Sequence, residues 1–255
     1  MKLVTFNIRC DYEQDGKNNF TLRKPLILEK LEREQPDVIC FQEVLPHVAA
    51  WLKQALPAYT AVGCGRGERL DGEQMTVAFR TDRLNLIQME TFWLSETPLV
   101  PGSRYPEQSE CPRTCTTALL CELATGRVLR VADTHLDHIG VGARTRGLRQ
   151  ILEHLSASAL FPHAPIVLAG DFNAEPDGGE MRAFDDFPGY VNAAADVGVT
   201  YHGYGQEPPE RIDYIWLKGP VACTGVQKWT DERAGVYLSD HYPICAELAW
   251  TGEEG

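Results

Sequence analysis

The sequence predicts an α/β (α+β) fold, a four-layer sandwich in which two packed mixed or antiparallel β-sheets are flanked by helices. Short apolar runs of strand length recur along the whole chain, and segments with helical spacing separate some of them. Parallel neighbouring strands require such helical crossovers. With 255 residues, the chain is long enough for one large domain with a substantial core. We therefore expect a single domain over residues 1–255.

The first part of the chain is typical of a strand-helix-strand unit. Residues 1–6 alternate like a strand, and apolar residues then follow helical spacing from Leu22 to Leu31. Pro25 is expected in the first turn of this helix, where its missing N–H costs nothing. The apolar run 38–41 then has strand length. Further along we expect a helix over 48–56 and strands over 59–62, 76–80 and 84–91.

The second part of the chain repeats this mixture after an irregular stretch. Residues 93–114 contain four prolines and predict a long ordered loop. Residues 141–160 predict a helix, with Leu148, Ile151, Leu152 and Leu155 on one side. Strands are expected over 116–123, 128–134, 165–169, 212–217, 220–226 and 244–248, with a short helix near 179–184.

The charge balance limits the partners of the protein. Asp and Glu number 36 against 24 Lys and Arg, so the formal charge is −12, which disfavours tight binding of duplex DNA. We expect no membrane span, because no run of about 18 apolar residues occurs. No cleavable signal segment is recognisable, which favours a cytoplasmic location with the eight cysteines as thiols. Whether Cys111 and Cys115 pair stays open.

Several predicted strands end in acidic residues, which indicates a cation site. The apolar run 168–170 ends at Asp171, with Asn173 two residues later. An acid at a buried strand end is costly unless a cation or donors compensate it. Glu43 and Asp213 occupy similar positions, and Asp240 stands beside His241 near the C-terminus. By the period-two rule, Asp171 and Asn173 are expected to point the same way along an extended segment.

Together with Asn7-Ile8-Arg9 and Thr134-His135-Leu136, these motifs resemble the endonuclease/exonuclease/phosphatase superfamily of DNase I-like metal-dependent phosphoesterases in composition and order. The resemblance spans the chain and implies the same four-layer sandwich. Asn7 and His135 are closer to the DNase I-like members than to the abasic-site endonucleases. Because the superfamily includes nucleases, deadenylases, inositol-phosphate phosphatases and sphingomyelinases, it implies a reaction type and no particular substrate.

The resemblance also implies roles for individual residues. Glu43 and Asp240 would bind Mg²⁺ or Mn²⁺, and His241 would be the general base. Asp171 would align the attacking water. The other roles implied are phosphate or water contacts by the amides of Asn7 and Asn173, charge stabilisation by His135, and orientation of a histidine, with His135 favoured, by Asp213.

Three further polar residues are weaker candidates for substrate binding, namely Arg144, His202 and Arg104. Arg144 is expected at the start of a helix, where arginines commonly pair with nearby acids in solvent. A solvated surface position explains each of the three at least as well. His138 lies close to His135 in the sequence and has the same two interpretations.

The leading functional hypothesis is a divalent-metal-dependent phosphodiesterase that uses in-line attack of water with a histidine base. Its substrate would be a small molecule or a short or single-stranded nucleic acid. One alternative is a phosphatase acting on a sugar phosphate, an inositol phosphate or a lipid headgroup. Another is a noncatalytic binding module, which metal-dependent hydrolysis of any phosphoester would exclude.

Overall fold

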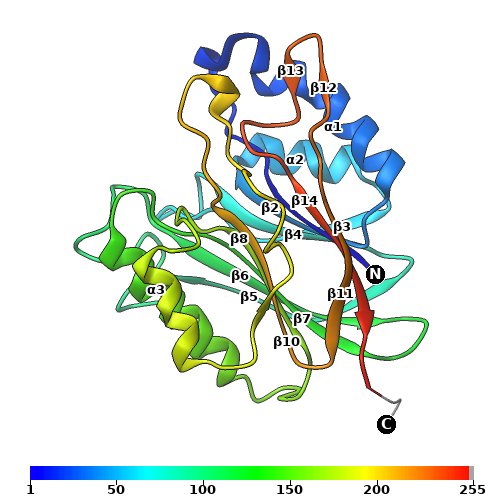
Figure 1. The fold of residues 1–255 in the computed structure, drawn as a ribbon, viewed down its shortest axis with the longest axis vertical. Helices are drawn as coiled ribbons and strands as arrows, with labels where there is room; N and C mark the ends of the chain where they lie inside the picture. Colours follow the sequence, from blue (N-terminus) through cyan, green and yellow to red (C-terminus); the bar gives the residue numbers. More distant parts are fainter. Residues whose placement is uncertain (253–255) are drawn as a thin grey trace.

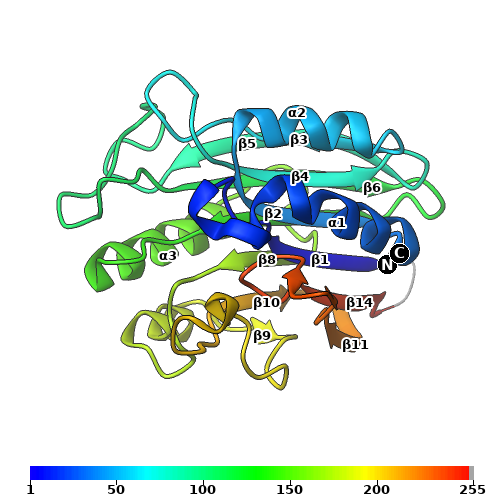
Figure 2. The same ribbon diagram turned by 90° about the horizontal axis from the view of Figure 1, so that it is seen from above.

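The computed structural model describes residues 1–252 of the chain. Two six-stranded sheets pack face to face, with α1 and α2 outside one sheet and α3 outside the other (Figures 1 and 2). The predicted four-layer α/β sandwich is therefore confirmed. The helices are α1 (Phe20–Glu34), α2 (Pro46–Ala55) and α3 (Val141–Ser156), with 3₁₀ turns η1 (Glu13–Asn18), η2 (Gly179–Asp186) and η3 (Gly203–Gly205).

The strands of each sheet are ordered as follows. Sheet A contains β11 (Val221–Lys228), β14 (Ile244–Trp250), β1 (Lys2–Asn7), β2 (Val38–Val44), β4 (Gln74–Arg80) and β3 (Tyr59–Val62). Sheet B contains β5 (Leu84–Trp93), β6 (Thr114–Glu122), β7 (Val128–His135), β8 (Ile166–Asp171), β10 (Asp213–Lys218) and β9 (Val191–Asn192). A separate hairpin is formed by β12 (Glu232–Arg233) and β13 (Val236–Tyr237).

The two sheets share one topology. Each is centred on a parallel pair, β1 with β2 and β7 with β8, and the chain between the paired strands forms α1 or α3. Antiparallel strands flank both pairs, β14 and β4 in sheet A and β6 and β10 in sheet B. The carboxyl ends of the central strands therefore occupy equivalent places in the two sheets. This internal symmetry leaves no recognisable repeat in the sequence.

Side chains that alternate between the two faces of each strand form three apolar cores, one between the sheets and one on the outer face of each sheet. On β1, Leu3 faces the core between the sheets, whereas Val4 and Phe6 pack with apolar residues of α1 and α2. On β8, Val167 faces the inter-sheet core and Leu168 packs with α3. Because successive strand residues point to opposite faces, both sheets are covered on two sides.

The structure corrects the start of the first helix. Asn19 caps α1, since its side-chain oxygen accepts a hydrogen bond from the N–H of Leu22 at 3.2 Å. The helix therefore begins at Phe20, and Pro25 is its sixth residue, beyond the predicted first turn. The β12–β13 hairpin was not predicted, because its strands are only two residues long and show no periodicity.

Two findings concern the expectations about membrane spans and cysteine pairing. None of the helices within residues 1–252 is long and apolar enough to cross a membrane. All eight cysteines lie in this range and are free, including Cys111 and Cys115.

A buried polar contact joins the two sheets. The Nε2 of Gln42 on β2 donates a hydrogen bond to Oδ1 of Asp133 on β7 at 2.6 Å, and both side chains are fully buried. The second carboxyl oxygen of Asp133 has no hydrogen-bond partner among the described residues. Burial therefore raises the pKa of Asp133 well above its ordinary value, although the bond from Gln42 opposes this.

We expect Asp133→Asn to make stability less dependent on pH. Because the folded state raises the pKa of Asp133, its contribution to stability is present below the unfolded pKa of about 3.9 and is lost as pH rises toward the folded pKa. The free energy of unfolding in urea should be measured for the wild type and for Asp133→Asn as a function of pH. Above pH 4, the wild type should lose up to about 1.4 kcal/mol per pH unit relative to the variant. The exposed Asp177→Asn is the control. Parallel pH profiles for wild type and Asp133→Asn would contradict this prediction.

Candidate active site

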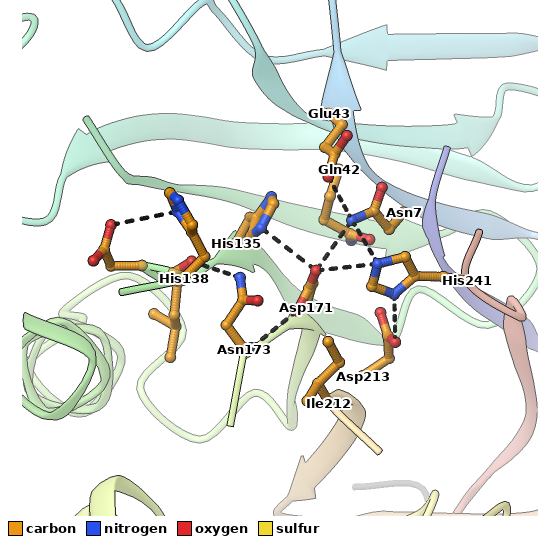
Figure 3. A network of polar contacts seen from close by, with 12 residues as sticks. Asn7, Gln42, Glu43, His135, His138, Asp171, Asn173, Ile212, Asp213 and His241 are labelled. Carbon is orange, nitrogen blue, oxygen red and sulfur yellow. Dashed lines mark hydrogen bonds and ion pairs between the residues drawn. The ribbon is translucent and has the colours of Figure 1, made fainter. Parts of the chain in front are cut away.

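Strand ends from both sheets converge on one edge of the sandwich (Figure 3). Asn7 and Glu43 come from the adjacent parallel strands β1 and β2, and His135 and Asp171 from the adjacent parallel strands β7 and β8. The antiparallel strands bring their beginnings to the same edge. These beginnings carry Asp213, which is the first residue of β10, and the pair Asp240 and His241, which precedes β14.

A cavity of about 440 Å³ opens at this edge. Its wall includes six of the predicted site residues, namely Glu43, His135, Asp171, Asn173, Asp240 and His241. Asn7 and Asp213 are buried and hydrogen-bonded to these residues. The structure therefore brings all eight principal candidates together.

Asn7 connects the acids of the two sheets. Its amide nitrogen donates to Oε1 of Glu43 and to Oδ2 of Asp171, each at 3.0 Å. These two bonds use both amide hydrogens, so the 3.4 Å contact with Nε2 of His241 is not a third donation. The Oδ1 of Asn7 accepts from the backbone N–H of Arg9 at 3.0 Å. The amide is therefore held at both ends.

Asp213 orients His241, which corrects the expectation that it would orient His135. The Oδ2 of Asp213 lies 2.8 Å from Nδ1 of His241. His135 lies on the other side of Asp171, with its Nε2 at 3.4 Å from Oδ2 of Asp171 (Figure 3). The antiparallel register of β10 and β8 pairs Asp213 with Asp171. An isolated antiparallel bridge between Tyr201 and His241 holds the backbone of His241 at the same edge.

The two histidines have opposite electrostatic environments. Burial alone would lower the pKa of His241, but Asp213 and Asp171 outweigh it and raise that pKa to about 10. Burial and the positive charges of Arg113 and Arg66 lower the pKa of His135 well below its ordinary value. At neutral pH the metal-free protein therefore holds His241 as an imidazolium and His135 as a neutral imidazole.

Asp171 lies between these rings and is held by several donors. Its Oδ1 accepts from the backbone N–H of Asn173 at 2.9 Å, in addition to the bond from Asn7. Burial raises the pKa of Asp171 to about 7, although the charge of His241 opposes this. The preceding Gly170 has φ +145°, and a Cβ there would lie 2.0 Å from the carbonyl oxygen of Thr134. Only glycine permits this approach.

The backbone at Asn173 differs from the extended segment that the sequence predicted. Asn173 has φ +48°, in the left-handed region, so the segment is not extended there, although the side chains of Asp171 and Asn173 both line the cavity. Its Nδ2 donates to the carbonyl of Leu136 at 3.1 Å. Glu43 and Arg9 also have positive φ, at +62° and +60°. Such backbone strain concentrates at functional sites.

Glu43 and Asp240 provide oxygen ligands suited to a hard divalent cation. Burial would raise the pKa of Glu43, but the bond from Asn7 and the charge of Arg9 outweigh it, so this carboxylate stays ionised. The pKa of Asp240 is raised by burial and by the charge of Glu43, despite the opposing charge of His241. A cation near the two carboxylates would relieve this repulsion, so their chemistry suits a hard divalent cation.

A second group could also hold a metal ion. Ligand atoms of Asp171, Asp213 and His241 all lie within 4.8 Å of one another. In this group the Nδ1 of His241 is already hydrogen-bonded to Asp213. The charge of His241 therefore balances part of the charge of these two acids. Glu43 and Asp240 are also partly balanced, because Arg9 lies 3.2 Å from Asp240 and the charges of Arg9 and His241 act on both carboxyl groups. In general, oxygen-only ligands suit hard divalent cations better than a set that includes a histidine nitrogen.

The three weaker candidates lie outside the cavity wall. Arg144 is buried and its Nε pairs with Glu180, so its charge is already balanced. Arg104 pairs with Glu110 in the 93–114 segment. His202 is buried and stacks on Tyr242 with ring centroids 4.1 Å apart.

Other residues of the cavity wall were not predicted as site residues. They include the cations Arg9, Arg66 and Arg113, together with Glu73 and Tyr12. His138, for which a substrate contact and a solvated position were equally supported, also lines the cavity. Arg66 and Arg113 belong to segments with no motif, so only their charge could have suggested a role.

This fold and this cluster of acids, amides and histidines are typical of a phosphoesterase site, and comparison with known proteins agrees. The chain belongs to the endonuclease/exonuclease/phosphatase family, whose sequence pattern matches residues 4–241. The members of this family are phosphoesterases, so the resemblance inferred from the motifs is confirmed.

Three similar proteins illustrate the breadth of the family. An endonuclease/exonuclease/phosphatase from Bacteroides vulgatus superposes with a TM-score of 0.91 at 29% identity, covering 98% of both chains. A mannosyl-6-phosphatase from Bacteroides thetaiotaomicron superposes with a TM-score of 0.87 at 25% identity, covering 98% of this chain and 100% of that one. Nocturnin from Xenopus laevis is 26% identical, covering 98% of this chain and 72% of that protein.

We expect Asp213→Asn to lower the pKa of His241 in the metal-free protein. Loss of a carboxylate at hydrogen-bond distance removes a charge that favours the imidazolium, which should lower the pKa by about 1 to 3 pH units. An NMR titration of the labelled imidazole in the presence of a chelator measures this change. The exposed Asp196→Asn should leave the titration unchanged. An identical His241 titration in Asp213→Asn and wild type would contradict the orientation found here.

Proposed function

We propose that the protein is a divalent-metal-dependent hydrolase of small-molecule phosphoesters. The observation that carries the proposal is the convergence of Glu43, Asp171 and Asp240 with two histidines on one cavity. A volume of about 440 Å³ is within the usual range for small-molecule sites. The net charge of −12 supports a substrate with few phosphates over a long polyanion. The similarity to a mannosyl-6-phosphatase is consistent with a small substrate.

The proposed roles follow from the contacts. Glu43 and Asp240 would hold Mg²⁺ or Mn²⁺. When bound, such an ion supplies a Lewis acid for a nonbridging phosphoryl oxygen. Asn7 keeps Glu43 and Asp171 at a fixed separation through its two donated bonds. Asp171, near the middle of the cluster, would align the attacking water.

His241 would exchange the proton of that water. Because Asp213 holds Nδ1, the Nε2 atom is left facing Asp171, at 3.7 Å from its Oδ2. As a general base, His241 must first lose the proton that its carboxylate neighbours favour. Nearby positive charge in the loaded enzyme would favour that loss. His135, being neutral, would contribute a hydrogen bond and no charge.

A substrate panel tests the proposed function. We expect hydrolysis of p-nitrophenyl phosphate, bis(p-nitrophenyl) phosphate or a sugar phosphate with Mg²⁺ or Mn²⁺, and none with chelator. Because a small ester displaces few counterions, kcat/KM at fixed free Mg²⁺ should change less than about threefold between low and physiological salt. Single-stranded and duplex DNA and RNA are the comparison substrates. Absence of metal-dependent turnover, or a preference for duplex DNA with a steep salt dependence, would refute the proposal.

We expect Glu43→Gln to weaken metal binding without unfolding the protein. The amide oxygen can still accept from Asn7, but the bond from the backbone N–H of Cys10 and the negative charge of the proposed ligand are lost. Calorimetry should show Mg²⁺ affinity reduced by at least about tenfold, in the range known for changes around metal sites. Glu210→Gln removes an exposed acid from the rim of the same cavity and should have little effect. Unchanged Mg²⁺ affinity in Glu43→Gln would remove Glu43 from the ligand set.

A further inference from the structure

Arg113 is a buried cation on the cavity wall with unused hydrogen-bond donors. Its side chain is only 4% exposed, and its Nε and Nη1 have no acceptor among the described residues. The nearest carboxylate oxygen is Oδ1 of Asp137, at 3.7 Å from Nε. That carboxylate already accepts hydrogen bonds from Ser109, Ile139 and Gly140. The charges of Glu73, on the same cavity wall, and of Asp137 therefore compensate Arg113 without supplying acceptors for its Nε and Nη1.

Such a guanidinium is costly in a folded protein. A buried charge that lacks its hydrogen bonds carries a desolvation penalty of several kcal/mol. Among residues 1–252, the one hydrogen-bond acceptor of the Arg113 side chain is an uncharged ring, since its Nη2 lies 3.0 Å from Nδ1 of His138. The side chain of His138 is 48% exposed at the cavity. An anion entering the cavity could replace this ring with a stronger, charge-assisted bond.

Arg66 brings a second cation to the same wall. Its Nη2 pairs with Glu73 at 2.6 Å, but its Nη1 is buried and has no acceptor in the part of the chain that the structure describes. The backbone of Arg66 is held on both sides, because its N–H donates to Glu73 and its carbonyl accepts from Nε1 of Trp93 at 2.7 Å. The position of Arg66 is therefore built into the fold.

The strand register places Arg113 beside the proposed reaction site. Arg113 directly precedes β6, and Cys115 on β6 pairs with Thr134 on β7. Continuing this antiparallel register brings Arg113 to the edge that carries His135. In agreement with this register, the positive charges of Arg113 and Arg66 lower the pKa of His135.

We propose that Arg113 and Arg66 form an anion subsite that binds a phosphate group with two negative charges, which is a terminal phosphomonoester. The planar donor fork of arginine matches phosphate oxygens and can bind two of them at once. A diester phosphate has one negative charge and two nonbridging oxygens, whereas a monoester has a further charged oxygen for the two cations. This inference rests on the proposed function and favours a monoester in place of the diester that the sequence favoured.

Binding of inorganic phosphate in the presence of a chelator tests the subsite without metal or turnover. By calorimetry, we expect wild type to bind phosphate, and Arg113→Met and Arg66→Met to raise Kd by at least about tenfold, the effect of losing a charged hydrogen bond. Arg113→Lys should be intermediate. Arg130→Met removes a similarly buried arginine outside this cavity and should leave Kd unchanged. If Arg113→Met fails to fold, Arg66→Met and Arg113→Lys decide the question.

Two results would overturn the subsite: no phosphate binding by wild type in chelator, or the same Kd in wild type, Arg66→Met and Arg113→Lys. Phosphate binding that depends on these arginines, in a protein without metal-dependent turnover, would support the subsite and refute only the proposed hydrolase function.

Kinetics with Mg²⁺ distinguish the phosphate being cleaved from a neighbouring phosphate. Arg66→Met should lower kcat/KM on p-nitrophenyl phosphate at least about tenfold more than on bis(p-nitrophenyl) phosphate, if the cleaved group occupies the subsite. If a neighbouring phosphate occupies it, the same loss should appear on a dinucleotide with a 5′-phosphate and not on the unphosphorylated dinucleotide. Equal losses on all four substrates would contradict a preference for the dianion.

Discussion

The site depends on the hydrogen bonds that Asn7 donates to one carboxylate from each sheet. Its amide nitrogen lies 3.0 Å from both Glu43 of sheet A and Asp171 of sheet B. The two sheets must therefore pack in one relative position for this amide to be satisfied. Gln42 and Asp133 impose a similar condition deeper between the sheets. Buried polar groups of this kind are costly when unpaired, so they select one packing arrangement over near alternatives.

The meeting of several carboxyl groups at the cavity concentrates negative charge there. Neighbouring cationic residues neutralise some of these carboxyl groups more than others. Asp213 and Asp171 hold a proton on His241, and Arg9 pairs with Asp240 at 3.2 Å. Glu43 and Asp240 still repel each other, which a divalent cation would relieve. On the neighbouring wall, Arg66 and Arg113 have buried hydrogen-bond donors that an anion would satisfy. A metal ion and a dianionic phosphate would together satisfy both groups, which links the proposed cofactor to the proposed substrate class.

Strand ends and helical periodicity were predictable because they depend on local patterns. Residues 59–62 form a strand with the predicted bounds, and the helix from residue 141 was recognised from its apolar face, although it ends at Ser156. The start of α1 was misjudged because the capping bond of Asn19 outweighs the apolar spacing as a marker of the first turn. The extended segment predicted from Asp171 to Asn173 is interrupted because Asn173 adopts a left-handed conformation, which asparagine tolerates better than most residues, and both side chains still line the cavity.

By itself, the sequence predicted the layered fold and, through the resemblance of its short motifs to the family, the eight residues that meet at the cavity. Only the tertiary structure decided which groups pair. Asp213 is bonded to His241 and not to His135, and Arg144 is neutralised by Glu180 away from the cavity. Arg66 and Arg113 became candidates only when their unused donors were seen on one wall. Pairing and burial depend on contacts between residues far apart in the chain, and no local pattern encodes those distances.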